Sequence, residues 1–124
     1  RLCGVTVGEV MSDRLGSAYR LSEKYGVTVL AKSADTFAVD GGKVYLCTEG
    51  TTTLAKGGSG DMLAGIVSSY VAQGCDALDA AALGSFTLGS TALLAGYKRS
   101  ERGIIARDVI DALPRFLYDL ENAE

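Results

Sequence analysis

The stretch of this sequence best suited to chemistry is the glycine-rich run LAKGGSGDMLAG over residues 54–65. Apolar residues at helical spacing follow it, which predicts a loop that leads into a helix. The first N–H groups of a helix have no partner inside it and carry partial positive charge. Because Gly57, Gly58 and Gly60 lack a β-carbon, an anion can approach the backbone closely there. The run therefore predicts a phosphate cradle, although Asp and Met after Gly60 exclude the GxxxxGK[ST] loop.

Asp61 in this run has two interpretations. A carboxylate repels a bound phosphate, so a site built for binding alone avoids one. A phosphoryl-transfer site instead needs a base that takes the proton of the attacking hydroxyl while backbone amides hold the transferring group. The other interpretation is an ordinary first-turn acid that the helix dipole favours. The local sequence leaves both open.

Two lysines stand near predicted ligand-binding positions. Lys32 ends a predicted strand, where ligands of α/β proteins bind, so one interpretation is a contact to a nucleotide phosphate or ribose, helped by Thr36. The alternative is a lysine that covers the strand end with its stem and keeps its charge in solvent. Lys56 adjoins the cradle and either contributes charge there or is solvated.

Composition excludes several classes of function. The chain of 124 residues suffices for one small domain, and it contains no histidine, which excludes Ser-His-Asp and Cys-His catalysis within it. Cys3, Cys47 and Cys75 form no CxxC pair and no metal-ligand cluster, which predicts a reducing, cytoplasmic setting and no protein-built metal centre. Twelve basic and fifteen acidic residues are interspersed, and the net charge of −3 argues against nucleic-acid binding.

The elements that must position these residues are four helices and three strands. Apolar periodicity predicts helices over 7–25, from 60 or 61 to 73, over 76–97 and over 108–120. Thr6 and Glu9 fit a capping box, which is a stronger interpretation of Glu9 than an active-site acid, and Gly26 is a natural helix end. A strand over 27–31 is followed by a hairpin of strands 37–39 and 43–47 around Asp-Gly-Gly.

The helix over 76–97 is apolar nearly all round, which predicts burial in a protein or a membrane. Its glycines, hydroxyl side chains and charged flanks favour a protein interior. Four helices have only one strand and a hairpin to pack against, whereas doubly wound folds bring several parallel strands. We therefore expect the chain to associate with a second copy or with a missing part of its sheet.

Longer stretches of the sequence resemble one family. LAKGGSGDMLAGIVSSYVAQG, DALDAAALGSFTLG and ARDVIDALP resemble the carboxy-terminal half of ADP/ATP-dependent NAD(P)H-hydrate dehydratases, of the ribokinase-like superfamily. VTVLAKSADTFAVDGGKVYLCTEG resembles the family's strand, Lys-Gly-Ala-x-Thr loop and hairpin. The resemblance implies an α/β fold: the carboxy-terminal part of a three-layer α/β/α domain, with about four helices, one core strand and a β-hairpin. Residues 1–124 would then be a single partial domain whose amino-terminal half is absent.

The resemblance also implies a reaction and a site. ADP or ATP, with Mg²⁺, phosphorylates the hydroxyl of hydrated NADH or NADPH, and loss of phosphate restores the reduced nicotinamide. The site residues implied for the nucleotide are Lys32, Ser33, Ala34, Asp35, Thr36 and Gly60. Gly57, Gly58 and Ser59 complete an anion hole with Gly60, and Asp61 is the acidic residue at the hydrate substrate, where it acts as the catalytic base. The chain departs from the family at Ser33, where the family has glycine, and over 50–53, where a GNPG-like stretch reads Gly-Thr-Thr-Thr.

Two alternatives to this function stay open. Sugar and vitamin kinases of the superfamily share the GxGD core, and such a kinase would use the same Asp61 as base but stop at the phosphorylated product. A non-catalytic fragment that folds by association is the third possibility. The partners implied are a nucleotide, a hydrated nicotinamide dinucleotide, and either a second copy or the amino-terminal half, with no nucleic acid and no membrane.

Overall fold

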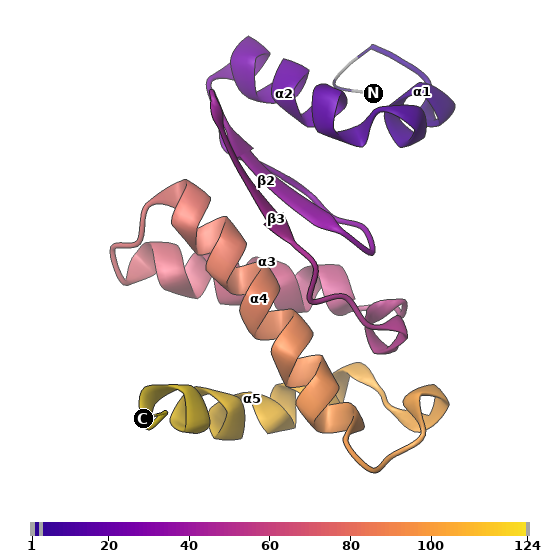
Figure 1. The fold of residues 1–124 in the computed structure, drawn as a ribbon, viewed down its shortest axis with the longest axis vertical. Helices are drawn as coiled ribbons and strands as arrows, with labels where there is room; N and C mark the ends of the chain where they lie inside the picture. Colours follow the sequence, from indigo (N-terminus) through magenta and orange to yellow (C-terminus); the bar gives the residue numbers. More distant parts are fainter. Residues whose placement is uncertain (1, 3, 124) are drawn as a thin grey trace.

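The computed structural model describes residues 2 and 4–123, and within them five α-helices and three strands surround a small core. The elements are α1 (Val7–Ser12), α2 (Arg14–Tyr25), β1 (Val29–Ala31), β2 (Thr36–Asp40), β3 (Lys43–Cys47), α3 (Ser59–Ala72), α4 (Ala77–Gly96) and α5 (Ala106–Glu121). Two 3-10 turns, η1 (Thr52–Leu54) and η2 (Glu101–Gly103), precede α3 and α5. The sheet lies between the α1–α2 pair and helices α3 to α5 (Figure 1).

The first predicted helix, over 7–25, is two helices in the structure. Asp13 leaves the helical conformation, with φ −141° and ψ 72°, and its carboxylate accepts a hydrogen bond from the Gly16 N–H at 2.9 Å. Asp13 thus ends α1 and caps α2, as aspartate does at helix starts. The prediction of one helix was wrong because apolar spacing continues across the break. The Thr6–Glu9 capping box and the left-handed Gly26, with φ 60°, are confirmed.

The three strands form one antiparallel sheet in the order β1-β2-β3. The hairpin over 36–47 is confirmed, and its two-residue loop contains Gly41 at φ 52°. The strand β1 pairs with β2, with Val29 opposite Val39, because the loop over 32–36 turns the chain back on itself. The predicted strand before the hairpin therefore extends it, and no parallel pairing occurs among the described strands.

Helix α4 is the centre of the fold. It packs against α3, α5, β2 and β3, and its buried face includes Ala80, Leu88 and Ala92. Two glycines bring neighbours close: a β-carbon at Gly84 would collide with the Val67 side chain, and one at Gly89 with the carbonyl of Glu49. Among the described helices it alone has the length and apolar composition of a membrane span, and half of that stretch is buried. These contacts account for its apolar surface as that of a core helix.

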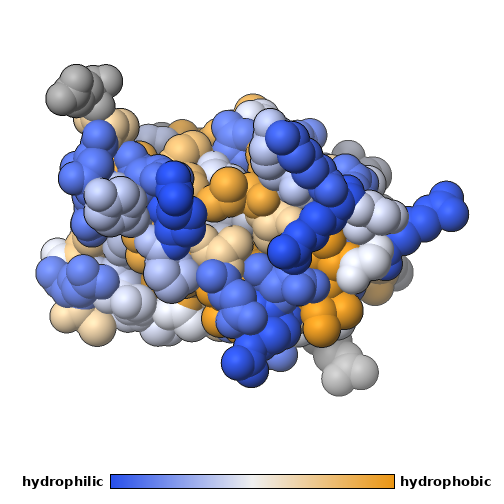
Figure 2. Space-filling model, turned by 90° about the horizontal axis from the view of Figure 1, so that it is seen from below, coloured by the Kyte–Doolittle hydropathy of each residue, from blue (hydrophilic) through white to orange (hydrophobic). Residues whose placement is uncertain are grey.

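Apolar side chains remain exposed around α5. Ile105 and Ile110 keep 62% and 50% of their surface exposed, and Leu93 on α4 keeps 51%. The face seen from below Figure 1 shows such apolar side chains between charged ones (Figure 2). This surface is larger than a scatter of single exposed residues, which are normal on soluble domains.

Candidate functional site

The segment over residues 32–36, which comprises the loop between β1 and β2 and the first residue of β2, is held from two directions. The buried Thr36 hydroxyl donates to the Ser33 carbonyl at 3.2 Å and accepts from the Ser33 N–H at 3.4 Å, so the loop closes on itself. From α2, the Arg14 guanidinium donates to the Asp35 carbonyl at 3.3 Å and lies 5.4 Å from the centre of the Phe37 ring. Sequence reasoning missed Arg14, because no local pattern connects it to a loop twenty positions away.

Ser33 fits this loop without backbone strain. Among the described non-glycine residues, only Lys98 has a positive φ, at 58°. Ser33 therefore adopts a conformation open to any residue. The glycine that the resemblance places here is not needed for the shape of the loop in this chain.

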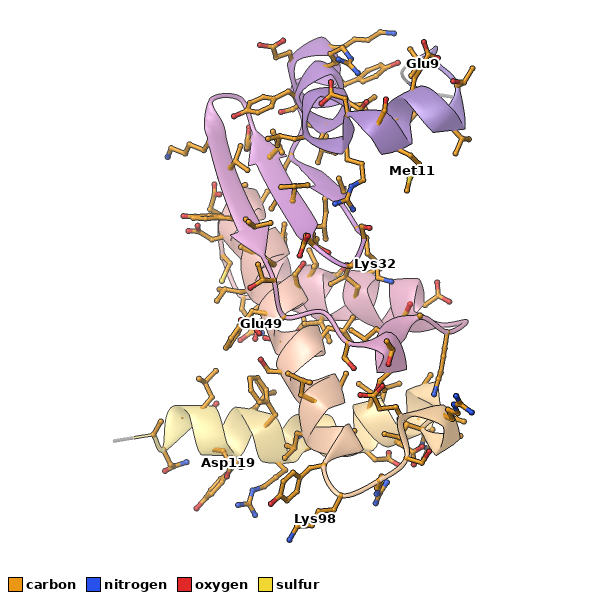
Figure 3. The ribbon with its side chains drawn as sticks, turned by 45° about the vertical axis from the view of Figure 1, so that its right-hand side comes forward. Glu9, Met11, Lys32, Glu49, Lys98 and Asp119 are labelled. Carbon is orange, nitrogen blue, oxygen red and sulfur yellow. The ribbon has the colours of Figure 1, made fainter. Side chains whose placement is uncertain are left out.

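Lys32 joins this loop to the glycine-rich run. Its Nζ donates a hydrogen bond to the Ser59 Oγ at 2.9 Å, and the side chain reaches from the end of β1 towards α3 (Figure 3). Ser59 is buried at the first position of α3. Two segments that sequence analysis assigned to nucleotide binding, 27 positions apart, are thus in direct contact.

The glycine-rich run forms an open helix start. Gly58 is the N-cap of α3 at φ 88°, and no side chain caps this helix. The N–H groups of Gly60 and Asp61 have no hydrogen-bond partner among residues 2 and 4–123. A β-carbon at Gly57 or Gly60 would meet no atom within 4 Å, and neither has a positive φ. Neither position requires glycine for the fold, so the open space there is available to a ligand.

A cavity of about 540 Å³ adjoins the Lys32 loop. Its walls come from that loop, from the end of β3 and the segment after it, and from α3 and α4; the lining residues are Lys32–Thr36, Cys47–Thr52, Leu54, Ala55, Leu63, Ser85 and Leu88. Gly50 permits close contact between the two loops, since a β-carbon there would collide with the Ala34 carbonyl. We call this the polar cavity. Sequence analysis assigned residues 32–36, which form one wall of this cavity, to the site. It missed Cys47, Ser85 and Leu88, because these residues belong to no recognised binding motif.

Cys47 is a cavity residue with a perturbed thiol. Burial raises its pKa, the Glu49 charge adds to that effect, and a hydrogen bond with Ser85 opposes it. Cys47 and Cys75 are both free, and Cys3 lies outside the described residues. Within the described part of the chain, no group of three or more Cys, Asp or Glu side chains could hold a metal ion.

A second cavity, of about 470 Å³, borders the same end of α3. It is lined by Gly58, Asp61, Met62, Gly65, Ile66, Leu88, Thr91, Ala106, Val109, Ile110 and Leu113, and we call it the apolar cavity. The exposed Asp61 carboxylate forms no hydrogen bond or ion pair with the described residues. The Thr91 hydroxyl is buried and also lacks a partner there. Asp61 thus lines a different cavity from Lys32, and Leu88 is common to both.

The fold class is that of carbohydrate-kinase-like α/β proteins. A Bacillus subtilis ADP/ATP-dependent NAD(P)H-hydrate dehydratase, co-crystallised with ATP/Mg²⁺, superposes with a TM-score of 0.85 at 28% identity and 95% coverage of this chain. The family model for NAD(P)H-hydrate dehydratase matches residues 1–115. The chain belongs to the NAD(P)H-hydrate dehydratase family, which confirms the resemblance drawn from its sequence.

Two relatives show how similar this chain is to known members of the family and how much of their length it covers. The bifunctional NAD(P)H-hydrate repair enzyme Nnr of Vibrio cholerae is 37% identical over 94% of this chain. The ADP-dependent (S)-NAD(P)H-hydrate dehydratase of Haloterrigena turkmenica is 37% identical over 90% of it. This chain spans 24% of the first relative and 42% of the second, and 43% of the Bacillus subtilis structure.

Proposed function

We propose that this chain carries the nucleotide-binding part of an ADP- or ATP-dependent NAD(P)H-hydrate dehydratase. The terminal phosphoryl group of the nucleotide passes to the hydroxyl of hydrated NADH or NADPH, and the hydroxyl proton goes to a base. The phosphate then leaves with its bonding electrons, a proton is lost from the neighbouring carbon, and the ring double bond re-forms. Family membership and the names of the relatives support this assignment.

The observation that carries the proposal is the glycine-rich start of α3 beside Lys32. The unpartnered N–H groups of Gly60 and Asp61 provide donors, and the helix dipole adds positive charge. The Lys32 ammonium, held on Ser59, adds a full charge next to them. These groups match the charge of a transferring phosphoryl group, which such preorganised donors stabilise.

The two cavities suit two different ligands. We assign the nucleotide to the polar cavity, whose walls offer hydroxyls, backbone groups and Lys32, together with the carboxylates of Asp35 and Glu49. We assign the hydrate substrate to the apolar cavity, whose walls suit the carbon atoms of a reduced ring and whose free carboxylate is Asp61. In this arrangement Asp61 takes the hydroxyl proton, because it is unpaired and stands three positions past the N-cap of the phosphate-holding helix.

Mg²⁺ fits this site when it is bound mainly by the phosphates of the nucleotide. The ion keeps several waters and is usually bound by phosphates and one or two carboxylates rather than by an all-protein cage. The described residues offer no group of three metal-ligating side chains, and Asp61 is the carboxylate nearest the cradle in sequence. When bound, Mg²⁺ supplies charge neutralisation on the phosphates.

The test is recovery of reduced-nicotinamide absorbance. The protein as its gene encodes it is mixed with NADH hydrate, Mg²⁺ and either ADP or ATP, and the absorbance of NADH is followed. We expect recovery that depends on the nucleotide and releases one phosphate for each NADH restored. Absence of recovery with both nucleotides overturns the proposal, and a stable phosphate ester of the substrate would establish a kinase instead.

We further propose that the exposed apolar surface around α5 is covered by the amino-terminal half of the domain. The chain spans less than half of the matched dehydratases, and Ile105 and Leu93, which lie outside the apolar cavity, keep more than half of their surface exposed. Sedimentation of residues 1–124 alone and with an added amino-terminal half tests this. We expect a one-to-one complex; self-association that persists in the presence of that half favours a homo-oligomer.

A further inference from the structure

Lys56, immediately before the glycines of the cradle, is hydrogen-bonded to a distant segment of the chain. Its Nζ donates to the carbonyl oxygen of Glu101 at 2.7 Å and also to the carbonyl oxygen of Ile104. Both acceptors belong to the connection between α4 and α5, 45 and 48 positions further along the chain. Neither expectation for Lys56, charge directed at the cradle or a solvated side chain, describes this half-buried ammonium group.

Two further contacts join the same segments. The Thr52 hydroxyl, in η1, is hydrogen-bonded to the Glu101 carboxylate. A β-carbon at Gly58 would lie 3.6 Å from that of Ala106, which is ordinary van der Waals contact. The segment over 52–58 therefore contacts the segment over 101–106 at three places. These are Thr52, Lys56 and the N-cap of α3, Gly58.

The second segment is itself well anchored. The Asp108 carboxylate accepts from the Ile105 N–H at 2.8 Å and lies 3.6 Å from the Arg99 guanidinium. The buried side chain of Ile104 belongs to the core cluster. The Ile104 carbonyl that Lys56 contacts is therefore well anchored, and a bond to it limits the movement of the backbone attached to Lys56.

The backbone attached to Lys56 is glycine-rich. Gly57 and Gly58 follow directly, and glycine loses more conformational freedom on ordering than any other residue. Lys56 forms no ion pair with the described residues, so its charge is balanced by the two carbonyl dipoles and not by a carboxylate. Loss of the ammonium group would leave both carbonyls without this donor and free the loop.

We propose that Lys56 is a positioning residue that fixes the glycine-rich cradle by clamping residues 52–58 to the α4–α5 connection. The inference rests on the proposed function in one respect, that the cradle holds the phosphates of the nucleotide. Its geometric part, that Lys56 restrains the loop, stands apart from any reaction. The clamp is thus a requirement for phosphate binding that involves no contact with the ligand.

The geometric part is tested by hydrogen exchange in the gene-encoded protein without nucleotide. The Ser59 N–H bonds to the Lys56 carbonyl, and the Gly103 N–H to that of Ser100, so one protected amide reports on each segment. In Lys56→Met we expect both amides to exchange at least about tenfold faster, and in Lys56→Arg to recover most of their protection, since Arg keeps charge-bearing donors at similar reach. The exposed Lys43→Met serves as the matched control and should leave both rates unchanged.

The functional part is tested by steady-state kinetics of the same variants. Lys56→Met should raise KM for ADP about tenfold with kcat within about threefold, because the disordered loop must be fixed again on each binding event. Lys56→Arg should restore KM. Wild-type exchange rates and wild-type KM in Lys56→Met overturn the clamp while the dehydratase assignment stands. A wild-type protein without nucleotide-dependent turnover overturns the assignment, and the exchange rates still decide whether Lys56 restrains the loop.

Discussion

The polar and apolar cavities are neighbours that share Leu88, yet they are chemically unlike. The first is walled by two loops rich in hydroxyl and backbone groups, and Lys32 stands at its edge bonded to Ser59. The second is walled by three helices and offers two polar side chains, Asp61 and Thr91. Within the first turn of α3, Ser59 is therefore hydrogen-bonded to Lys32 of the polar cavity, whereas the free carboxylate of Asp61 lines the apolar cavity.

On the proposed function, this difference would let one short glycine motif serve two substrates. Asp35 and Glu49 line the polar cavity, whereas Asp61 lines the neighbouring apolar cavity, within one helical turn of the cradle. Four substitutions or modifications test the distinction, from the largest expected effect to the smallest.

Asp61→Asn is expected to remove turnover and to spare the polar cavity. Without a base for the hydroxyl proton, kcat should fall about 10³-fold while the Kd for ADP stays within about twofold. The NADH-hydrate assay and calorimetry with ADP measure the two quantities on the gene-encoded protein. Asp111→Asn, at an exposed pair with Arg107 on α5, is the control and should change neither. Equal losses of kcat and ADP affinity in Asp61→Asn would assign Asp61 a structural role.

Gly60→Ala should separate stability from binding. Alanine replaces glycine inside a helix in open space, so we expect the free energy of unfolding to rise by about 0.5–1 kcal/mol. Its methyl group would occupy the phosphate position, and ADP affinity should fall about tenfold. Gly65→Ala, in the same helix and equally open but bordering the apolar cavity, should leave ADP affinity unchanged. Similar ADP affinities in both variants would contradict a phosphate at the cradle.

Cys47 should report occupation of the polar cavity. Its raised pKa lowers the thiolate fraction, so alkylation by iodoacetamide at about pH 8 should be slower than for a free thiol and should accelerate as the pH rises towards the folded pKa. The same shift means that its contribution to stability is complete below the pKa of the unfolded chain and is lost as pH rises through the folded value.

Saturating ADP should slow the alkylation of Cys47 further. Mass spectrometry of the labelled peptides measures the rate at each cysteine. Cys75, in the turn between α3 and α4, does not line that cavity and is the internal control. Equal protection of both thiols by ADP would indicate a general tightening of the fold rather than occupation of the cavity.

Thr91→Val should have the smallest effect, which is on the free energy of unfolding. Thr87→Val, one turn earlier in α4, is the matched variant for comparison. Both threonines are 1% exposed, but the Thr87 hydroxyl lies 2.8 Å from the Tyr70 hydroxyl while that of Thr91 has no partner among the described residues. We expect Thr87→Val to lower the free energy of unfolding by about 1 kcal/mol and Thr91→Val to leave it unchanged or slightly raised. Chemical denaturation measures both. A loss in Thr91→Val equal to that in Thr87→Val would mean that the apolar cavity holds a hydrogen-bond partner for Thr91.

Local signals in the sequence were sufficient for most of the elements. The Thr6–Glu9 box, Gly26 and the Asp-Gly-Gly turn each depend on residues within a few positions, and the structure confirms all three. The break at Asp13 was missed because the side chains on either side keep a helical spacing, and only the turned backbone distinguishes a cap from a helical aspartate.

The site was predictable only where residues adjoin in sequence. The Lys32 loop and the glycine-rich run were named as the nucleotide-binding segments, and those assignments stay predictions. The Lys32–Ser59 contact, the Arg14 bond to the loop and the Lys56 clamp join residues 21 to 48 positions apart, which no local pattern encodes. The lining by Ser85 depends on the packing of α4 beneath the loops, which is a property of the tertiary fold.

The glycine at position 89 has a consequence for how this domain tolerates variation. Because the Glu49 carbonyl rests where a side chain would begin, every substitution at Gly89 would lift the loop that forms one wall of the polar cavity. A saturation-mutagenesis scan would therefore record position 89, in the middle of a helix and outside both cavity linings, as intolerant in the manner of a binding residue. Such a map would identify residues that keep a binding wall in place as well as residues that touch a ligand.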